Sequence, residues 1–491
     1  MKTFLCAASS GLLLCCSFPP VGLGFLAYVA IVPMFFVVES SNLRAVSVYA
    51  WISGLVFLGL SLSWIRHITW VGMILAVLIL ALFYAIPFIC AKFLSEFKPW
   101  LGLLIFPFSI AGIEWIRSFD QLAFPWMIIG NSQTYYPWLI QFADITSAYG
   151  VSCWVAAVNV SVYILIKKRS TGRFILLTLL FVVPLIYSRI VLHRSTSSGN
   201  QITVALIQGN VTPEEKWGYN MREWNINLYR SLSIEAAACD PDLIVWPETA
   251  IPSYLSEHSP SRSKIHSLVD SLNIPVFTGV PTEDINTEET WNSAGLFIPG
   301  EEEIRRYHKI HLVPFGEAIP LDNIFPILRK IDFDQANWNE GAETVVFEPP
   351  GLPPFNAAIC FESIFPDLIR KFIVKGSQFI VVITNDIWFG PFASPIQHAM
   401  ISVMRAIEFH RPIIRCANTG ISMIIDSNGN IVKRTETFKR TTLVGSIVPS
   451  QEKTVYARFG NIFSLVSFVI FAISNIYCFI IRYYASVRKS A

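Results

Sequence analysis

The sequence predicts two kinds of structure in one chain, a polytopic α-helical membrane domain and an extracytoplasmic α/β domain. Hydrophobic residues make up 53% of the 491 residues and charged residues only 15%, which is more apolar than a soluble protein of this length. The long uncharged runs lie almost entirely before residue 195 or after residue 460, and the stretch between them carries most of the Asp and Glu. We therefore expect a membrane domain with seven transmembrane helices at 1–194, a folded domain at 195–458, and an eighth transmembrane helix with a cytoplasmic tail at 459–491.

About eight apolar runs are candidates for crossing a bilayer. A transmembrane helix needs on the order of 20 mostly apolar residues, and the candidate runs lie near 3–18, 21–38, 45–65, 71–94, 101–116, 146–166, 174–192 and 461–481. The first run also resembles a cleaved leader peptide, but a second apolar run follows directly after Pro19 and Pro20, which favours its retention. One or two helices would suffice as an anchor, so eight indicate a cavity or a lateral entrance for lipids.

Lysine and arginine are distributed unevenly between the expected loops. Positive charge resists translocation, so short loops rich in these residues stay in the cytoplasm. The odd-numbered short loops offer little beyond Arg66 and Arg117. The termini and the even-numbered loops carry Lys2, Arg44, Lys92, Lys98, Lys167, Lys168, Arg169, Arg173, Arg482, Arg488 and Lys489. We therefore expect both termini in the cytoplasm and residues 195–458 on the outer side of the membrane.

In the segment 195–458, short β-rich runs alternate with amphipathic helical patterns. The strand-like runs are 202–209, 242–247, 275–280, 293–298, 356–360, 378–385, 412–417 and 422–426, and the helical patterns are 219–238, 261–272, 363–374 and 395–410. This alternation predicts a layered α/β domain. The runs from 412 onward follow one another without helices, so we expect mixed sheets with helices packed outside. The polar stretches 281–292 and 324–342 are expected to be mobile loops.

Three polar residues close apolar strand-like runs: Glu248, Lys309 and Cys360. Side chains at strand ends reach the sheet edge where loops build sites, so the three can converge in one crevice. A thiolate is a nucleophile, a carboxylate takes and returns protons, and an ammonium favours the thiolate and an oxyanion. Each residue also has a simpler interpretation: a buried structural cysteine, a helix-capping glutamate and a solvated lysine. Of nine cysteines only three lie in this domain, which indicates a free thiol rather than disulfides.

The motifs around these residues resemble a known superfamily. "VWPETAIP", "YHKIHLVPFGEAIP", "AAICFESIFPD" and "TNDIWFG", in this order, are similar to the nitrilase, or carbon–nitrogen hydrolase, superfamily and its Glu-Lys-Cys triad. The eight expected spans, together with "EWIRSFDQLAFPW" and "MRAIEFHRPIIRCANTG", narrow the resemblance to the apolipoprotein N-acyltransferase family. It covers essentially the whole chain and implies an αββα sandwich for the α/β domain.

The resemblance also implies roles for individual residues. Cys360 would be the nucleophile and acyl carrier, Glu248 the general base, and Lys309 the support of the oxyanion. Glu317 matches a second carboxylate of the family and would position the lysine, and Glu362 matches another carboxylate that the family needs. Phe361 stands where many relatives carry tyrosine, so a hydrogen bond from that hydroxyl is absent. Further positions that would line or support the pocket are Trp217, Asn292, Trp388 and Arg415.

The resemblance implies an enzyme of the bacterial cytoplasmic (inner) membrane with its catalytic domain on the periplasmic side. It would form a thioester from a phospholipid, by implication phosphatidylethanolamine, and pass the acyl chain in a ping-pong reaction to the N-terminal amine of an apolipoprotein's diacylglyceryl-cysteine. We expect no metal and no cofactor, because neither Cys-x-x-Cys nor His-Glu-x-x-His spacing occurs. The net charge of +2 and the lack of a basic stripe argue against nucleic acid as a partner.

Two other functions remain open at this point. A membrane-tethered carbon–nitrogen hydrolase acting on small amides or nitriles would use the same triad with another pocket. A transporter or receptor could instead carry the outer domain as a non-catalytic binding module. Both the hydrolase and the receptor share the fold, so residue patterns alone do not separate them from an acyltransferase.

Overall fold

The computed structural model describes residues 1–119, 121–194, 200–218, 221–255, 259–284, 287–320, 338–390 and 393–490. The chain divides into two compact units, Met1–Arg194 together with Phe459–Ala491, and Ser195–Arg458. We call these the membrane unit and the α/β unit.

Among its described residues, the membrane unit has six helices that are long and apolar enough to span a bilayer. These are α4 (Leu43–Ser61), α5 (Trp70–Ser95), α6 (Pro99–Ile116), α7 (Ala143–Lys167), α8 (Thr171–Arg194) and α15 (Ile462–Ser490). They coincide with six of the eight expected spans. The first two apolar runs form shorter helices, α1 (Lys2–Ser17), η1 (Gly24–Leu26), α2 (Ala27–Ala30) and α3 (Val32–Ser40). A total of eight spans therefore stays a prediction.

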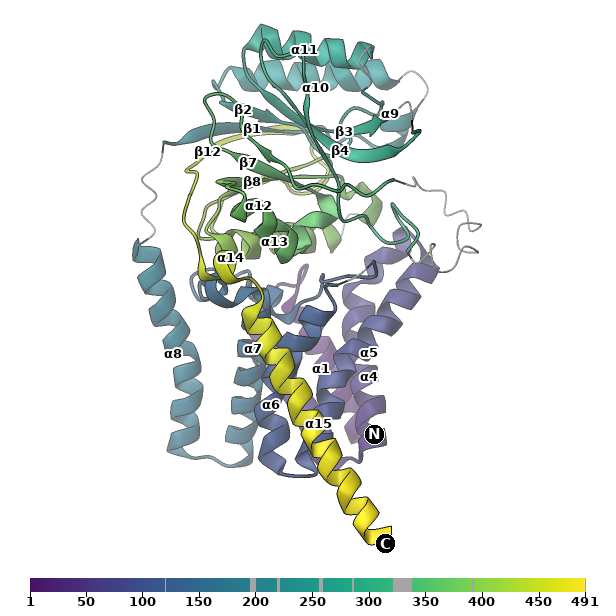
Figure 1. Cartoon of the computed structure of the whole chain (residues 1–491), viewed down its shortest axis with the longest axis vertical. Helices are drawn as coiled ribbons and strands as arrows, with labels where there is room; N and C mark the ends of the chain where they lie inside the picture. Colours follow the sequence, from purple (N-terminus) through teal and green to yellow (C-terminus); the bar gives the residue numbers. More distant parts are fainter. Residues whose placement is uncertain are drawn as a thin grey trace. The chain divides into compact units, whose positions relative to one another are not determined.

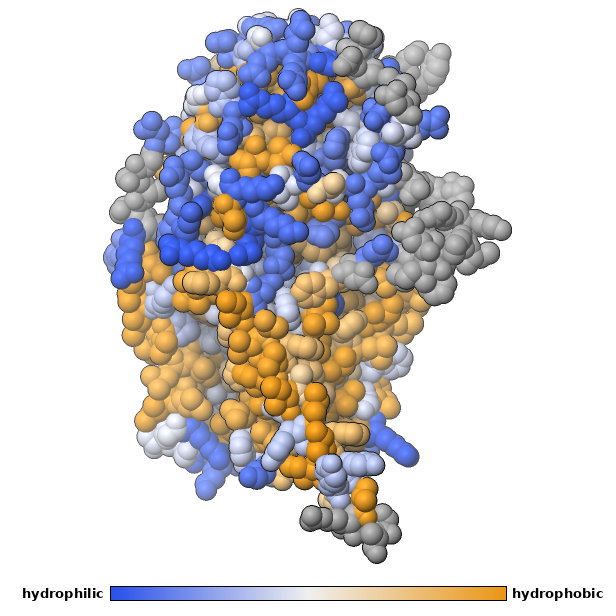
Figure 2. All heavy atoms as spheres, in the orientation of Figure 1, coloured by the Kyte–Doolittle hydropathy of each residue, from blue (hydrophilic) through white to orange (hydrophobic). Residues whose placement is uncertain are grey.

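Small residues allow the helices of the membrane unit to pack closely. A Cβ atom on Gly11 of α1 would overlap the Ser53 carbonyl oxygen of α4, and one on Gly112 of α6 would lie 2.8 Å from the Phe468 Cα atom of α15. Such close backbone approach is the usual way in which helices associate in lipid. Figure 2 shows apolar side chains covering the visible face of α15, which is the surface expected against hydrocarbon chains. The membrane unit thus packs through small residues and presents apolar ones outward.

The described residues of the α/β unit form two six-stranded mixed sheets. The first has the order β12-β1-β2-β3-β4-β5 and the second the order β11-β10-β9-β8-β7-β6. In each sheet the three parallel strands are joined through helices, and antiparallel neighbours extend the edges. The first sheet comprises β1 (Ile202–Gln208), β2 (Leu243–Val245), β3 (Val276–Glu283), β4 (Thr290–Phe297), β5 (Arg305–His308) and β12 (Thr441–Ile447). The second comprises β6 (Val346–Phe347), β7 (Phe355–Ile359), β8 (Phe379–Thr384), β9 (Ile413–Ala417), β10 (Met423–Ile425) and β11 (Ile431–Arg434).

Helices cover the outer faces of both sheets, as Figure 1 shows with α10 and α11 on one side and α12 and α13 on the other. The bounds of these helices are α10 (Met221–Ala237), α11 (Pro260–Leu272), α12 (Pro366–Val374) and α13 (Ser394–Phe409), and the shorter α9 (Pro213–Trp217) and α14 (Val455–Phe459) complete the set. The first sheet packs on α10 through Tyr229 and Trp246, whose ring centroids lie 5.2 Å apart. Between the sheets, Phe277 of β3 lies 5.3 Å from Phe355 of β7. Burying such apolar side chains contributes about 1.5–3 kcal/mol each.

All eight expected strands and all four expected helices of the α/β unit are present, with shifted ends. Four strands were not predicted: β5, β6, β11 and β12. They carry polar or exposed residues, and they are short or lie at or near sheet edges. The predicted bounds of the loop at 281–292 were wrong at both ends, because residues 281–283 continue β3 and residues 290–292 begin β4. Most of the other expected loop, 324–342, lies outside the described residues.

Candidate active site

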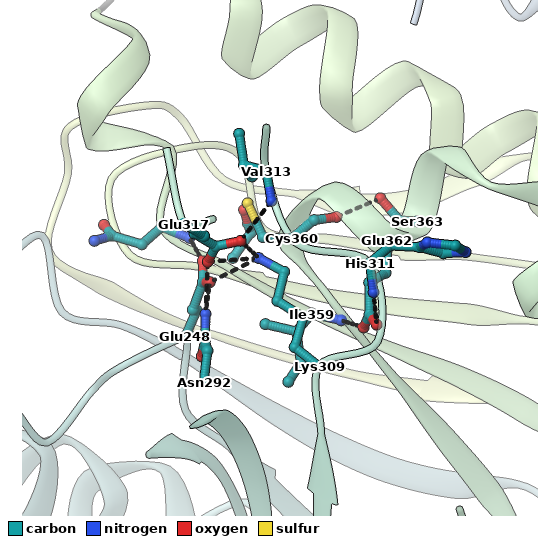
Figure 3. Close-up of polar contacts among 12 residues, drawn as sticks. Glu248, Asn292, Lys309, His311, Val313, Glu317, Ile359, Cys360, Glu362 and Ser363 are labelled. Carbon is teal, nitrogen blue, oxygen red and sulfur yellow. Dashed lines mark hydrogen bonds and ion pairs between the residues drawn. The ribbon is translucent and has the colours of Figure 1, made fainter. Parts of the chain in front are cut away.

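Glu248, Lys309 and Cys360 come together inside the α/β unit (Figure 3). Glu248 follows β2, Lys309 follows β5 of the same sheet, and Cys360 follows β7 of the other sheet. All three are buried, and the Lys309 Nζ atom lies 3.6 Å from the Glu248 Oε1 atom. The charges of Glu248 and Lys309 both act on the Cys360 thiol. Strand ends of two facing sheets therefore bring the three predicted residues into one cluster.

Cys360 occupies a strained turn between a strand and a helix. Its φ angle is 52°, in the left-handed region that costs a non-glycine residue on the order of 1–3 kcal/mol. β7 ends at Ile359, and the 3₁₀ helix η5 (Cys360–Ile364) begins at Cys360 itself. The Cys360 carbonyl oxygen accepts a hydrogen bond from Ser363 Oγ at 2.9 Å. The sharp turn places the sulfur at the end of the strand rather than in the sheet.

Glu248 is held as an acceptor by two amide groups. Its Oε1 atom accepts from Asn292 Nδ2 at 2.8 Å, and its Oε2 atom accepts from the Asn385 backbone N–H at 2.8 Å. Burial raises the pKa of Glu248 above the usual carboxyl value, the nearby Lys309 opposes this, and Glu317 adds to it. A buried carboxyl group with a raised pKa can accept and return a proton near neutral pH.

Lys309 is clamped between two carboxylates. Its Nζ atom donates to Glu317 at 2.8 Å, and Glu317 in turn accepts from Asn292 Nδ2 at 2.9 Å and from the Val313 backbone N–H at 2.9 Å. Burial lowers the pKa of Lys309, but the charges of Glu317 and Glu248 outweigh it and hold the pKa above its usual value. The amine is therefore held in its charged ammonium form, which suits it to stabilise an anion beside Cys360.

Glu362 does not touch Lys309 by a hydrogen bond, but it fixes the chain on both sides of it. Its Oε1 atom accepts from Tyr307 Oη at 2.6 Å and from the backbone N–H groups of Ile310 and His311 at 2.7 and 3.2 Å. Its Oε2 atom accepts from the Ile359 N–H at 2.8 Å. Burial raises the pKa of Glu362 to about 7, against the effect of these hydrogen bonds. One carboxylate thus ties the lysine segment to the cysteine turn.

The other predicted residues are scattered around this cluster. Asn292 bridges Glu248 and Glu317, as described above. Phe361 is buried and packs on Phe365, with ring centroids 5.2 Å apart. Arg415 pairs with Asp386 at 3.0 Å instead of contacting the three clustered residues. The side chain of Trp388 lies outside the described residues.

Trp217 lies at the end of α9 and is 55% exposed. It lines a hollow of about 700 Å³ together with Lys216, Arg222 and Lys264. The buried Lys216 connects this hollow to the cluster, because its Nζ atom lies 3.5 Å from the Glu248 carbonyl oxygen. Trp217 is therefore a neighbour of the site rather than a member of the cluster.

Sequence reasoning missed Lys216, Asn385, Asp386 and His398. Asn385 and Asp386 belong to the quoted "TNDIWFG" motif, where they follow β8 just as Cys360 follows β7, so the strand-end argument could have found them. Lys216 sits in a polar stretch and His398 in a helix of otherwise periodic apolar residues, and neither pattern carries a distinctive signal.

One group of side chains has the composition of a metal site. The Sγ atom of Cys360, an oxygen of Asp386 and a ring nitrogen of His398 all lie within 4.8 Å of one another, and these are zinc-ligand types. The Arg415 guanidinium, however, lies 3.0 Å from both Asp386 and His398. Its positive charge opposes a cation there, and both ring nitrogens of His398 already have hydrogen-bond partners. These donors do not fit a resident metal ion, and the absence of a metal stays a prediction.

Two mixed sheets with a buried Glu, Lys and Cys at their strand ends define a class of protein, and comparisons with known sequences identify that class. The profile of the carbon-nitrogen hydrolase family matches residues 203–456, so the α/β unit is a nitrilase-like domain of that superfamily. The profile of the apolipoprotein N-acyltransferase N-terminal domain matches residues 10–161. The chain as a whole belongs to the apolipoprotein N-acyltransferase family, which confirms the resemblance found in the sequence.

Individual relatives cover nearly the full length. The apolipoprotein N-acyltransferase of Geobacter metallireducens is 34% identical over 94% of this chain and 92% of its own. That of Chlorobaculum tepidum is 32% identical over 99% of this chain and 97% of its own. Among solved structures, Saccharomyces cerevisiae Nit3, a member of the nitrilase superfamily, matches 53% of this chain and 94% of its own with 16% identity and a TM-score of 0.40.

Proposed function

We propose that this protein transfers an acyl chain from a phospholipid, through a thioester on Cys360, to the N-terminal amine of the diacylglyceryl-cysteine of an apolipoprotein. The family relationship supports the overall reaction. The observation that carries the chemistry is the burial of Lys309 between Glu248 and Glu317 beside a cysteine in a strained turn. Cys360 is the nucleophile, Glu248 the general base and Lys309 the oxyanion support.

In the first step the thiol must lose its proton. Burial, reinforced by Glu248, raises the pKa of Cys360, and Lys309 opposes the rise, so the resting group is a thiol. Glu248 takes the proton as the sulfur attacks the ester carbonyl of the phospholipid. Negative charge develops on the carbonyl oxygen next to the fixed Lys309 ammonium. The intermediate collapses, the C–O bond breaks, and the leaving glyceryl oxygen takes the proton from Glu248 to give a lysophospholipid and the acyl thioester.

In the second step the acceptor amine attacks the thioester. Glu248 takes a proton from the nitrogen, a C–N bond forms, and the C–S bond breaks to return the Cys360 thiolate, which is reprotonated by Glu248. A thioester keeps its acyl-transfer potential while yielding readily to an amine. Because the donor product leaves before the acceptor reacts, the kinetics are ping-pong. Water must be kept out between the two steps.

Location and partners follow from the same proposal. Phosphatidylethanolamine is the donor, and the protein resides in the bacterial inner membrane with eight spans, both termini in the cytoplasm and the α/β unit in the periplasm. The distribution of lysine and arginine between loops supports this orientation. The apolar helices of the membrane unit supply contact with the acyl chains of the donor. Trp217 and Trp388 are assigned to the pocket lining.

The test is mass spectrometry of a reporter lipoprotein incubated with the purified protein in phosphatidylethanolamine vesicles. The proposal expects the N-terminal peptide to gain one amide-linked acyl chain with wild-type protein and none with Cys360→Ala. Equal amounts of triacylated peptide with both proteins would overturn it.

Two further measurements separate this proposal from the two alternative functions. A membrane-tethered hydrolase would release ammonia from small amides in a Cys360-dependent reaction and leave the lipoprotein unchanged. A receptor with a non-catalytic module would support growth of a depleted strain equally well with Cys360→Ala. The acyltransferase proposal expects neither result.

A further inference from the structure

A second polar cluster lies directly behind the Cys360 turn. It consists of Asp386 after β8, His398 on α13 and Arg415 on β9, all fully buried. Arg415 Nη2 donates to Asp386 Oδ2 at 3.0 Å, and Thr384 Oγ1 donates to Asp386 Oδ1 at 2.9 Å. Burial raises the pKa of Asp386, but Arg415, His398 and Thr384 together outweigh it and hold the pKa below its usual value. The carboxylate is therefore ionised and its position is fixed.

His398 connects this cluster to the backbone of the nucleophile. Its Nδ1 atom lies 3.0 Å from Asp386 Oδ1 and 3.0 Å from Arg415 Nη2. Its Nε2 atom lies 3.0 Å from the Cys360 carbonyl oxygen and 2.9 Å from Ser363 Oγ. The Cys360 carbonyl is thus contacted by two side chains, His398 and Ser363.

The direction of this carbonyl matters because Cys360 has a φ of 52°. An ordinary backbone would relax toward negative φ, which turns the Cα–Cβ bond and moves the sulfur. Two hydrogen bonds to the carbonyl oppose that relaxation, since each would have to be broken or lengthened. A misplacement of about 1 Å at a nucleophile can cost roughly 100-fold in rate.

A different role for His398, as the base that deprotonates Cys360, fits the geometry less well. A base needs a free lone pair within reach of the proton that it takes, and a neutral histidine has only one. With the Nε2–H group directed at the Cys360 carbonyl, that lone pair is on Nδ1, which faces Arg415 Nη2. Burial lowers the pKa of His398, and Arg415 lowers it further. The ring is well placed to orient a carbonyl and poorly placed to collect a proton.

We propose that His398, oriented by an Arg415 guanidinium that Asp386 holds in place, is a positioning residue that donates from Nε2 to the Cys360 carbonyl and thereby aims the sulfur. The inference rests on the proposed function, because it assumes that Cys360 is the nucleophile.

The test uses two substitutions of similar size in the full-length protein. In His398→Gln the amide NH2 can reach the place of Nε2 and donate to the Cys360 carbonyl. In His398→Asn the shorter amide reaches only the place of Nδ1. We expect His398→Asn to lower the kcat of acyl transfer by about 10- to 100-fold, with a KM within threefold of the wild-type value. In His398→Gln we expect at least half of this loss in kcat, measured on a logarithmic scale, to be recovered.

Alkylation of Cys360 by iodoacetamide gives a second measurement that needs no acyl transfer. It should slow at least threefold in His398→Asn, because the displaced sulfur moves away from the Lys309 charge that lowers the pKa of the thiol. It should stay near the wild-type rate in His398→Gln. If wild-type protein transfers no acyl chain, the proposed function fails while alkylation still tests His398.

Equal kcat and equal alkylation rates in the Gln and Asn variants would overturn the positioning role. Loss of the acidic limb of the pH–rate profile in both variants would also overturn it, in favour of a base. If His398→Asn does not fold, Ser363→Ala removes the other carbonyl contact, and we expect it to lower kcat by about three- to tenfold with unchanged KM. Unchanged kcat in Ser363→Ala would contradict the proposal.

Discussion

Replacing Glu362 by Gln tests whether one carboxylate joins the lysine segment to the cysteine turn. The carboxylate accepts four hydrogen bonds, three on Oε1 from Tyr307, Ile310 and His311, and one on Oε2 from Ile359. Glutamine has a single acceptor oxygen, so its NH2 group must face either the Ile359 N–H or the three donors on the other side. At least one buried donor loses its partner in Glu362→Gln.

The magnitude follows from these contacts. An unsatisfied buried N–H costs about 1–3 kcal/mol, and changing the remaining hydrogen bonds from a charged to a neutral acceptor costs roughly 1 kcal/mol more in total. Burying the Glu362 carboxylate is itself unfavourable, as its pKa of about 7 indicates. A neutral glutamine avoids that cost, which offsets part of the destabilisation. We therefore expect a net destabilisation of about 2 kcal/mol, which corresponds to a fall of roughly 4–8 °C in the unfolding midpoint of a domain of this size.

The assay is thermal unfolding of the detergent-solubilised protein at pH 8, together with the rate of thioester formation. Tyr307→Phe is the matched control, because it removes one donor and leaves every backbone N–H with its acceptor, so its cost should stay below about 1 kcal/mol. Glu362→Gln should also lower the rate by up to about 30-fold as Lys309 loses its fixed place. A midpoint within 1 °C of wild type, or a smaller effect than Tyr307→Phe, would refute the reasoning.

Three further predictions concern the site, the pH dependence of stability and the orientation. Asn292→Asp places a third carboxylate between Glu248 and Glu317, so it should lower the rate of thioester formation more than Asn292→Ala does; equal rates would contradict the bridging role. Burial lowers the pKa of Lys216 to about 8, so the unfolded state binds the lysine proton more tightly than the folded state does. The free energy of unfolding should therefore rise as pH increases from about 8 to 10.5. Denaturant titrations at several pH values measure this rise, and Lys216→Met should remove it. Cys239 is the exposed cysteine of the α/β unit, so a membrane-impermeant maleimide should label the wild-type protein in intact spheroplasts. The Cys239→Ala variant should not be labelled at this position. If Cys239 is labelled only after the cells are lysed, the α/β unit lies in the cytoplasm.

The parts of the fold that sequence reasoning found are those with strong periodicity. β8 is buried at all six residues and reads as an uninterrupted apolar run, so its existence is evident from composition. By contrast, β5 has the sequence "RRYH", in which only Tyr307 is buried. Its strand state depends on pairing with β4, a long-range contact that overrides local preference.

The site was accessible to sequence reasoning only where residues end apolar strands. That rule found Glu248, Lys309 and Cys360, and the resemblance added Glu317, Glu362 and Asn292. It could not show that Glu362 supports the segment around Lys309 through backbone N–H groups, because those contacts depend on the path of the chain after β5. Nor could it find His398, whose place in the network depends on how α13 packs against the η5 turn.

The account depends most directly on an acyl group residing on Cys360. Intact-protein mass spectrometry after incubation with phosphatidylethanolamine, in the absence of any acceptor, measures this. We expect wild-type protein to gain the mass of one acyl chain that hydroxylamine removes, Glu248→Gln and Lys309→Met to gain it far more slowly, and Cys360→Ala not to gain it. A hydroxylamine-sensitive acyl chain that persists in Cys360→Ala, or full acylation without Glu248 and Lys309, would contradict the account.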